Sequence, residues 1–524
     1  MLISQILNNR SIIVFIIPFL IGSLSILSFQ PFNLTFINFI TLPCFFLIIT
    51  HVNRRSKNTY RKKPYLINIF YTGYFFGYGF FLFGNFWISH SLTFDNDLTY
   101  LIPFAIILIP AFLALFFGFS TLLIGRFLKN NFYSILLFCS SLSIFDFLRS
   151  KILTGFPWNL WSYSWSWFPE VIQILNPIGL FAFNLLSLTI FLLPLLLIFK
   201  KTKQNIMIFS ILILLFFINY IFGSYKLNKN QFLLQNLNQN NKDLIYVKIV
   251  TTNNELNYSP SISDVEKTLE NLIKFSDPKK ERKTLFIWPE GSFGGYSFAD
   301  VQQFKRIFSR AFSKNHVIIF GINTKKNNSE KDLYNSLLAV DNNFKVIYTY
   351  NKTKLVPFGE FLPYEKILDN LGLTKITRGY GFFSKGKEQN ILSLEKFNIL
   401  PLICYEIIFT ELVQMPANKI NLIVNISEDG WFGNSIGPHQ HLAKAIFRAV
   451  ESNTFLARST NKGISAFIDN SGVVIKRLEP YEAGNIELKI PLIETNHKNK
   501  NDLIFFLLLI TYISIFLIFK KNEK

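Results

Sequence analysis

Three residues that lie far apart in the chain have the side chains that covalent acyl transfer requires. Glu290 ends the apolar run "TLFIWPE", Lys352 ends "KVIYTYNK", and Cys404 lies near the end of "ILPLICYE". A carboxylate takes the thiol proton, because the thiolate is the nucleophile, and an ammonium stabilises the charge that grows on the carbonyl oxygen. If these runs are strands of one layered domain, their ends can converge in one crevice. Spacing alone leaves three other interpretations open: a loop acid, a surface lysine and a buried filler cysteine.

The cysteine count favours the nucleophile interpretation. The chain has three cysteines, and Cys44 and Cys139 both fall inside long apolar runs. Cys404 is therefore alone in the polar part of the chain, where it has no disulfide partner. His439 and His441 lie two positions apart with no Cys/His cluster beside them, so no metal site is predicted.

Apolar runs predict that the chain is a membrane protein. Half of the 524 residues are hydrophobic, and they gather in runs long enough to cross roughly 30 Å of hydrocarbon as helices. The runs cover 11–29, 34–50, 65–93, 99–125, 131–148, 170–199, 206–223 and 503–519. We predict a membrane α-helical bundle of about eight spans. Residues 1–223 would hold seven of them, 224–502 an inserted domain of ordinary polarity, and 503–524 the eighth span with a tail.

The charges of the loops predict the orientation. Fifteen Lys and Arg residues lie in the loops and ends on one side of the spans, against two on the other. Because basic loops stay in the cytoplasm, both termini are expected there and the 224–502 domain outside it. The net charge of +20 does not indicate nucleic acid, since outside the loops the basic residues are spread along the chain. Anionic lipid headgroups are the simpler partner.

The inserted domain has the pattern of a layered α/β fold. Strands are predicted at 244–251, 284–290, 316–322, 335–341, 345–352, 399–406, 420–427 and 463–469. Helices are predicted at 261–276, 300–313 and 438–452. Strands that alternate with helices indicate a layered α/β or α+β domain. The sequence has no P-loop and no dinucleotide-binding fingerprint.

Several motifs resemble one enzyme superfamily. "WPE" (288–290), "CYE" (404–406) and "NISEDGWFG" (425–433), with "NKTKLVPFGEFLP" (351–363), resemble the nitrilase, or carbon–nitrogen hydrolase, superfamily. With "TGFPWNLWSYS" (154–164) and "SIGPHQHLAKAIFRAVES" (435–452), the whole chain resembles the bacterial apolipoprotein N-acyltransferases. This resemblance implies that the inserted domain is an αββα sandwich. It also implies a place in the bacterial inner membrane, with this domain in the periplasm.

The resemblance implies a Glu–Lys–Cys triad and a reaction. Glu290 would be the general base, Lys352 the oxyanion stabiliser and Cys404 the nucleophile. Enzymes of this family take an acyl chain from a membrane phospholipid, typically phosphatidylethanolamine, onto the cysteine as a thioester. They pass it to the α-amine of the diacylglyceryl-cysteine of an apolipoprotein. No cofactor is implied, because thioester exchange needs no metal or external energy source.

Three further residues match supporting positions of the family. Glu360, in "PFGE", would support the lysine and help to position the substrate. Tyr405 and Glu406 match functionally sensitive positions directly after the nucleophile. We also expect the aromatic loops 291–298 and 378–386 to enter the bilayer surface, with Phe382 and Phe383 in contact with lipid.

The chain departs from the family pattern around the expected pocket. Gly291 follows "WPE" where Thr is usual, Glu428 and Gly430 replace Asn and Ala before "WFG", His439 replaces a frequent Trp, and Lys462 replaces Asn or Thr. These changes affect the expected rate and substrate preference, and Glu428 would either repel phosphate or face solvent. Two rival functions stay open. One is a membrane-tethered amidase or nitrilase-like hydrolase with water as acceptor, and the other is a non-enzymatic lipoprotein-binding or scaffold protein.

Overall fold

The computed structural model describes residues 9–59, 65–199, 201–239, 244–257, 260–325, 333–363, 383–395, 397–414, 420–491 and 501–522. The chain folds as two compact units. One contains Met1–Ser89, Leu101–Tyr225 and Lys500–Lys524. The other contains His90–Tyr100 and Lys226–Asn499. The second unit therefore includes a short segment, His90–Tyr100, that the sequence analysis assigned to the membrane region.

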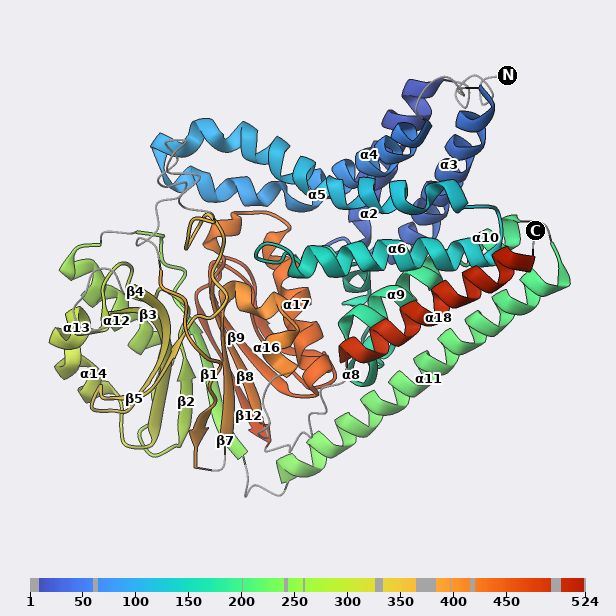
Figure 1. The fold of residues 1–524 in the computed structure, drawn as a ribbon. Coiled ribbons are helices and arrows are strands. Elements are labelled where there is room, and N and C mark those ends of the chain that lie inside the picture. Colours follow the sequence, from blue (N-terminus) through green and yellow to red (C-terminus); the bar gives the residue numbers. More distant parts are fainter. Residues whose placement is uncertain are drawn as a thin grey trace. The chain divides into compact units, whose positions relative to one another are not determined.

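The first unit is a bundle of apolar helices (Figure 1). Its main helices are α2 (Ile17–Ser25), α3 (Asn38–Thr59), α4 (Tyr65–Asn85), α5 (Ile102–Ile124), α6 (Phe132–Lys151), α9 (Leu180–Phe191), α10 (Pro194–Ile198), the first part of α11 (Lys203–Gln239) and α18 (Asn501–Asn522). The part of α11 after Tyr225 belongs to the second unit. Seven described helices are long and apolar enough to cross a membrane, and a shorter apolar helix covers Ile12–Ser28. These helices cover the eight predicted apolar runs, so the predicted multi-pass membrane protein is confirmed.

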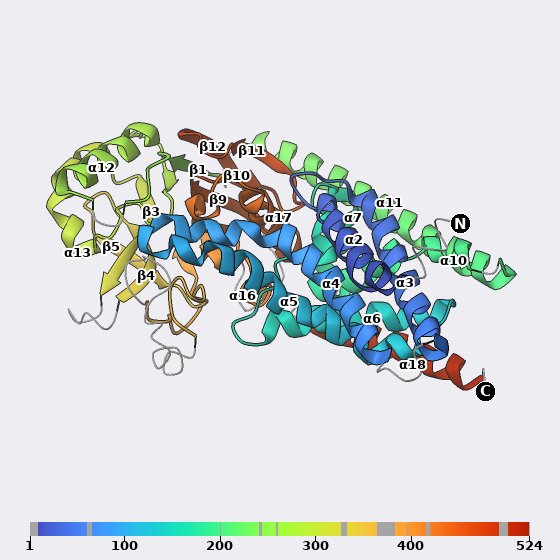
Figure 2. The same cartoon turned by 90° about the horizontal axis from the view of Figure 1, so that it is seen from above.

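The bundle differs from the prediction in its sixth span. The run 170–199 was expected as one helix, but it forms α7 (Pro169–Ile172), α8 (Leu175–Ile178), α9 and α10. Proline cannot donate an intrahelical hydrogen bond, so Pro194 begins a new helix and does not continue α9. Helices α2, α3 and α4 lie side by side when viewed from above (Figure 2).

A buried ion pair accommodates the charges of α6. Arg149 Nη2 lies 2.9 Å from Asp146 Oδ1, and Asn184 of α9 donates to Asp146 Oδ2 at 3.0 Å. Arg149 also donates to the carbonyl oxygens of Phe156 and Asn159 in the loop that follows. Charged groups inside a bundle are stable only when they are paired in this way.

The second unit contains two six-stranded sheets. The first sheet has the order β12-β1-β2-β3-β4-β5 and the second the order β11-β10-β9-β8-β7-β6. The first consists of β1 (Leu244–Thr251), β2 (Thr284–Ile287), β3 (His316–Lys325), β4 (Leu333–Val340), β5 (Val346–Asn351) and β12 (Gly484–Pro491). The second consists of β6 (Leu392–Leu394), β7 (Phe397–Ile403), β8 (Leu422–Glu428), β9 (Phe455–Asn461), β10 (Ser465–Ile468) and β11 (Val474–Leu478).

Each sheet has three central parallel strands with antiparallel strands at both edges. In the first sheet β1, β2 and β3 are parallel, and in the second β7, β8 and β9 are parallel. The carboxyl ends of parallel strands meet at one edge of a sheet, where ligands commonly bind. Glu290 follows β2, and Cys404 directly follows β7.

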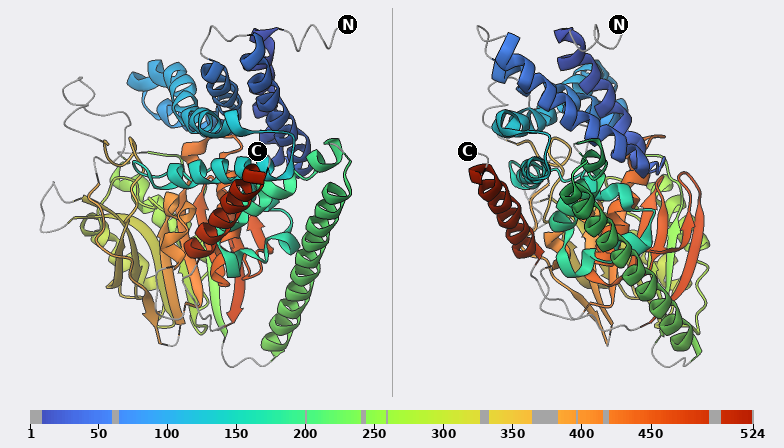
Figure 3. Two further views of the ribbon diagram at one scale, coloured as in Figure 1. Left: turned by 45° about the vertical axis from the view of Figure 1, so that its right-hand side comes forward. Right: turned by 90° about the vertical axis from the view of Figure 1, so that its right-hand side faces the viewer.

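Helices cover the outer faces of the two sheets, which pack against each other (Figures 1 and 3). On one side lie α12 (Ile262–Ser276), α13 (Phe298–Val301) and α14 (Lys305–Ala311), and on the other lie α16 (Glu411–Gln414) and α17 (Gly437–Ser452). Leu269 of α12 and Phe308 of α14 pack with Phe286 and Phe320 of the first sheet in a buried apolar cluster. This arrangement confirms the predicted α/β domain with an αββα order of layers.

The sequence predicted eight of the twelve strands. It missed β6, β9, β11 and β12. The boundary of one predicted helix was also wrong, since 300–313 contains the end of α13, a 3-10 turn and α14. β9 ("FLARSTN") was missed because its polar residues are typical of a solvated loop, yet all seven are buried.

Candidate active site

A tight turn after β2 positions Glu290. Trp288 N donates to Ile319 O at 2.8 Å and Gly321 N donates to Pro289 O at 3.1 Å, so the turn continues along β3. This approach requires glycine at position 321, because a Cβ there would lie 2.5 Å from Glu290 Cα. Glu290 is 8% exposed. Its backbone is therefore held by the sheet while its carboxylate keeps limited access to solvent.

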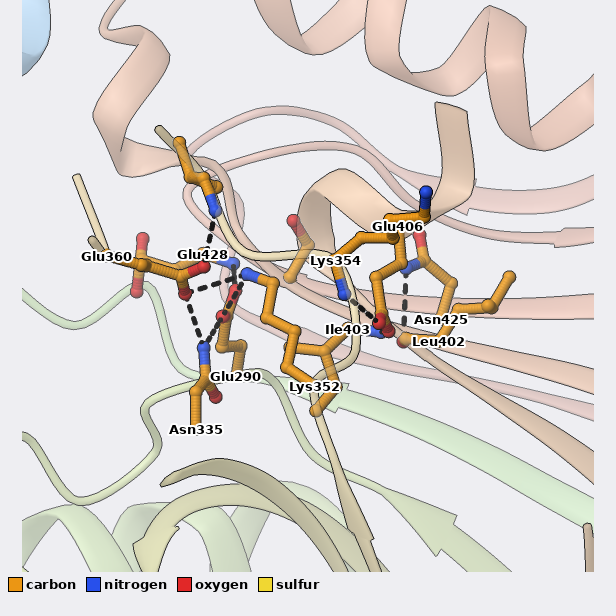
Figure 4. Close-up of polar contacts among 12 residues, drawn as sticks. Glu290, Asn335, Lys352, Lys354, Glu360, Leu402, Ile403, Glu406, Asn425 and Glu428 are labelled. Carbon is orange, nitrogen blue, oxygen red and sulfur yellow. Dashed lines mark hydrogen bonds and ion pairs between the residues drawn. The ribbon is translucent and has the colours of Figure 1, made fainter. Parts of the chain in front are cut away.

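The end of β5 places Lys352 between two carboxylates (Figure 4). Lys352 Nζ donates to Glu360 Oε1 at 2.8 Å and lies 3.6 Å from Glu290 Oε1. Asn335 of β4 donates through Nδ2 to Glu290 Oε1 at 2.7 Å and to Glu360 Oε1 at 2.8 Å. The lysine is 1% exposed. A buried ammonium needs such partners, and here the two carboxylates and one amide form a closed polar cluster.

A turn directly after β7 presents Cys404. Its φ of +51° lies in the left-handed region, which is uncommon for residues other than glycine. Such backbone conformations concentrate at functional sites, where the surrounding structure enforces them. Cys404 is 9% exposed, and the charges of Glu290 and Lys352 both act on its thiol. The structure therefore brings the three predicted triad residues into one electrostatic cluster.

The charges of the cluster favour a protonated thiol and a charged lysine at rest. Burial raises the pKa of the Cys404 thiol, and the negative charge of Glu290 raises it further, against the opposing effect of Lys352. Burial alone would lower the pKa of Lys352, but the carboxylates of Glu360 and Glu290 outweigh it and hold this pKa above its usual range. A thiol held in this state needs a base before it can act as a nucleophile, and Glu290 is a carboxylate whose charge reaches it.

Glu406 ties the turn that carries Cys404 to the loop that carries Lys352. Its Oε1 accepts from Thr353 N at 2.7 Å, Lys354 N at 3.1 Å and Tyr350 Oη at 2.8 Å, and its Oε2 accepts from Ile403 N at 2.9 Å. Glu406 is fully buried, so these bonds replace its hydration. The neighbouring Tyr405 is 8% exposed and packs edge-on against the ring of Phe409.

Glu428 is buried beside Glu290 and does not face solvent. It is 7% exposed, its backbone N donates to Glu290 Oε2 at 2.9 Å, and its carboxyl accepts from Gly430 N at 2.9 Å and from Asn461 Nδ2 at 2.8 Å. Burial raises the pKa of Glu428 well above its usual range, and Glu290 raises it further. Of the two alternatives for Glu428, the solvent-facing carboxylate is therefore wrong, and the repulsion of phosphate stays a prediction.

Glu428 and Gly430 form a matched pair. A Cβ at position 430 would lie 2.8 Å from Glu428 Oε1, so the Gly430→Ala variant is expected to displace this side chain and to lose about 1 to 3 kcal/mol of unfolding free energy. The Glu428→Asn/Gly430→Ala double variant, with a shorter side chain at 428, should recover part of that loss, since the added Cβ would still lie 2.9 Å from Leu256 Cδ1. Thermal unfolding of the purified variants measures both. A double variant as unstable as Gly430→Ala would contradict the pairing.

The expected lipid-contacting loops are only partly described. Phe293, in the loop 291–298, is 2% exposed and belongs to the apolar core with Trp288 and Phe320. Phe383 is 8% exposed. The burial of Phe383 contradicts the expected contact of this side chain with lipid, and Phe382 lies outside the described residues.

Sequence reasoning missed several residues of the site. Asn335 joins the two carboxylates, and Ser427, Asp429 and Arg458 form a buried group close to Cys404. A polar residue at the start of an apolar run marked Asn335, and the dense polar stretch "NISED" marked Ser427 and Asp429. Among the described residues, no group of three or more His, Cys, Asp or Glu side chains could hold a metal ion.

The electrostatics of the thiol predict opposite effects on two readouts in the Glu290→Gln variant. Removal of the negative neighbour lowers the pKa of Cys404, because Lys352 is then less opposed, so alkylation of Cys404 by iodoacetamide at pH 8 should become faster. Acyl transfer should fall by about 10² to 10⁴-fold, because the base is lost. Peptide mass spectrometry measures the alkylation. Slower alkylation than in the wild type would contradict this assignment, and the exposed Glu395→Gln is the control.

Comparison with known proteins agrees with this fold. The family model described as "Apolipoprotein N-acyltransferase N-terminal domain" matches residues 21–193, and the one described as "Carbon-nitrogen hydrolase" matches residues 256–496. A solved carbon–nitrogen hydrolase superfamily protein from Xanthomonas campestris covers 48% of this chain and 91% of its own, with 16% identity and a TM-score of 0.35. The two family models agree with a multi-pass membrane protein that carries a domain similar to the carbon–nitrogen hydrolases.

Two curated relatives match along nearly the whole chain. The apolipoprotein N-acyltransferase of Rickettsia typhi is 33% identical over 494 residues, which cover 91% of this chain and 92% of the relative. That of Rhodopseudomonas palustris is 30% identical over 491 residues, which cover 91% and 89%. The chain belongs to the apolipoprotein N-acyltransferase family.

Proposed function

We propose that this protein transfers an acyl chain from a membrane phospholipid to the α-amine of the diacylglyceryl-cysteine of an apolipoprotein, through a thioester on Cys404. The observation that carries the proposal is the cluster in which Lys352 lies 2.8 Å from Glu360 and 3.6 Å from Glu290, with both Glu290 and Lys352 acting on the Cys404 thiol. Membership of the family supports the same reaction.

In the first step, Glu290 takes the thiol proton and the Cys404 sulfur attacks the ester carbonyl of the phospholipid. Lys352 stabilises the negative charge on the carbonyl oxygen. The C–O bond then breaks, the lysophospholipid leaves as an alcohol with the proton from Glu290, and the thioester remains. The proton moves within one cluster, so the net charge of the buried site stays constant and little desolvation energy is added.

In the second step, the amine of the acceptor attacks the thioester carbonyl. Glu290 accepts the proton of the amine, the C–S bond breaks, and the thiol of Cys404 is restored with that proton. Both steps use one base and one oxyanion stabiliser, as two acyl transfers of similar difficulty require. Glu360 and Glu406 act as positioning residues for Lys352 and Cys404.

We also propose a location in the bacterial inner membrane, with both termini in the cytoplasm and residues 224–502 as the periplasmic catalytic domain. The excess of Lys and Arg in the loops on one side supports this orientation. Both lipid substrates would then reach the site by diffusion in the outer leaflet. Phosphatidylethanolamine is the proposed donor.

The test is reconstitution of the full chain in vesicles with a fluorescent diacylglyceryl-cysteine peptide. Mass spectrometry should find the peptide N-acylated in phosphatidylethanolamine vesicles, and less so in phosphatidylglycerol vesicles. Free fatty acid without acylated peptide would favour the hydrolase alternative and overturn the proposal. The absence of both products, with a folded protein, would overturn it in favour of a non-enzymatic role.

A further inference from the structure

A fully buried polar network lies next to the Cys404 turn and is not used by the mechanism above. Ser427 Oγ donates to Asp429 Oδ1 at 2.7 Å, and Arg458 Nη2 donates to Asp429 Oδ1 at 3.0 Å and to Oδ2 at 2.7 Å. Ser427, Asp429 and Arg458 are each no more than 1% exposed. Buried charges are costly unless they are paired, so this network is expected to have a function or a strong structural role.

The register of three parallel strands places the network beside the nucleophile. Ile403, the last residue of β7, pairs with Ile426 of β8, so the residues that follow this pair are Cys404 in the turn and Ser427 on β8. Asn425 of β8 pairs with Arg458 of β9. Neighbouring strands lie about 4.8 Å apart, which puts a serine hydroxyl within reach of an adjacent side chain. The Ser427 side chain lies close enough to the Cys404 sulfur to lower the pKa of the thiol.

The network also holds the backbone of the nucleophile strand. Asn425 Nδ2 donates to Leu402 O at 3.2 Å, two residues before Cys404, and Asn425 Oδ1 accepts from Arg458 Nη1. The guanidinium group of Arg458 therefore holds both the β7 backbone, through Asn425, and the Ser427 hydroxyl, through Asp429. Arginine suits this role because its donors have fixed directions and it stays charged.

His441 and nearby charges complete the surroundings of Asp429. Nδ1 of His441 lies 2.8 Å from Arg458 Nη2 and 3.1 Å from Asp429 Oδ1. Burial and then the charge of Arg458 lower the pKa of His441 to about 4, so the imidazole is neutral at pH 7. Burial alone would raise the pKa of Asp429, but Arg458 holds it well below its usual range. The other charged groups here are Lys444, near His441, and Glu428.

The Ser427 hydroxyl has one proton and two candidate acceptors. While Cys404 is a thiol, the hydroxyl donates this proton in a hydrogen bond to Asp429 Oδ1, and the serine oxygen can accept the S–H. Once the sulfur is a thiolate, it is the stronger acceptor on that side. Asp429 keeps its two bonds from Arg458 when the hydroxyl turns away, so the turn leaves no buried charge unpaired.

We propose that Ser427 is a positioning residue that orients the Cys404 thiol at rest and turns its hydroxyl to the sulfur when Glu290 removes the thiol proton. Ser427 keeps its own proton throughout. At rest the hydroxyl donates to Asp429, which Arg458 holds in place. The hydroxyl leaves this acceptor when the thiolate forms and returns to it when the thiol is restored. The network thus lowers the cost of forming the thiolate at each of the two acyl transfers. This inference rests on the proposed role of Cys404 as nucleophile.

The test uses the full chain in phosphatidylethanolamine vesicles and two readouts on Cys404. The first is the rate of iodoacetamide alkylation between pH 6 and 10, read on the Cys404 peptide, and the second is single-turnover formation of the acyl-thioester. In Ser427→Ala both should be about tenfold slower below the thiol pKa, because a hydrogen bond to a charged group is lost. Thermal unfolding should change little, since only one oxygen atom is removed.

Two further variants separate the hydroxyl from packing. Ser427→Thr keeps the hydroxyl and should stay close to the wild type in both readouts. Ser459→Ala removes another buried hydroxyl, on β9, which donates to Val250 O at 3.1 Å, and should leave both readouts unchanged. A wild-type alkylation profile and acylation rate in Ser427→Ala would overturn the inference, as would an equal loss in Ala and Thr. If the wild-type chain never carries an acyl group on Cys404, the proposed function itself fails.

Discussion

The Cys404→Ala variant is expected to lose N-acylation by at least about 10⁴-fold, because it lacks the thiol that is the proposed nucleophile. Alanine fits the same turn, so the fold should be retained, and thermal unfolding should occur near the wild-type temperature. Mass spectrometry of a diacylglyceryl-cysteine peptide measures the transfer. Intact-mass analysis of the protein should find an acyl adduct in the wild type and none in the variant.

A matched control is available for this prediction. Cys44→Ala removes a half-buried thiol from the membrane unit and should leave transfer and the acyl adduct unchanged. N-acylation at the wild-type rate by Cys404→Ala would show that the thiol is not the nucleophile. The position of Cys404 after β7 would then need a structural explanation.

The Lys352→Met variant is expected to have the second largest effect, because it affects both catalysis and stability. Without the ammonium, the charge on the carbonyl oxygen loses its stabilising partner, and transfer should fall by at least about 10³-fold. Glu290 and Glu360 would be left buried without their cation, which costs about 3 to 5 kcal/mol of unfolding free energy. Activity and urea unfolding in detergent measure the two effects.

The pH dependence that Lys352 gives the wild type follows from the sign of the pKa shift of this lysine. The pKa of Lys352 is raised in the folded protein, so its charge stabilises the fold fully below the unfolded value and is lost only as the pH rises through the folded value. Between pH 6 and 9 the lysine does not titrate. The activity of the wild type in this range should therefore report groups other than Lys352.

Lys354→Met is the control for this prediction. Lys354 Nζ pairs with Glu411 at 3.2 Å, but its side chain is 34% exposed. Partly exposed pairs contribute only about 0 to 1 kcal/mol, so this variant should stay close to the wild type. Equal losses in the Lys352 and Lys354 variants would contradict a specific role for the buried ammonium.

Local patterns predicted most of the fold because the burial of most segments follows from their composition. The apolar runs became helices, and the alternating polar and apolar run 261–276 became α12 (Ile262–Ser276). The failure to predict β9 has a tertiary cause. β9 contains Arg458, whose burial is possible only because Asp429 and Asn425 lie on neighbouring parts of the sheet. Both partners lie far from Arg458 in the sequence, so the residues around Arg458 do not indicate that it is buried.

In the candidate site, too, some residues could be predicted from the sequence and others only from the tertiary structure. The chemistry of Glu290, Lys352 and Cys404 can be read from residue types at the ends of apolar runs, and the supporting positions Glu360 and Glu406 follow from motifs. Their roles stay predictions. Asn335 could not be ranked above other asparagines of the chain, because its importance depends on the distance between two carboxylates that belong to other strands.

The sequence by itself determined the membrane spans, the α/β class of the inserted domain and the side chains available for acyl transfer. Each of these depends on composition within a short stretch of chain. Only the tertiary structure decided that Glu428 is buried beside Glu290, that Asn335 joins two carboxylates, and that Ser427 adjoins the nucleophile. All three findings depend on distances between strands, and these distances are set by the register of the strands and the layering of the two sheets.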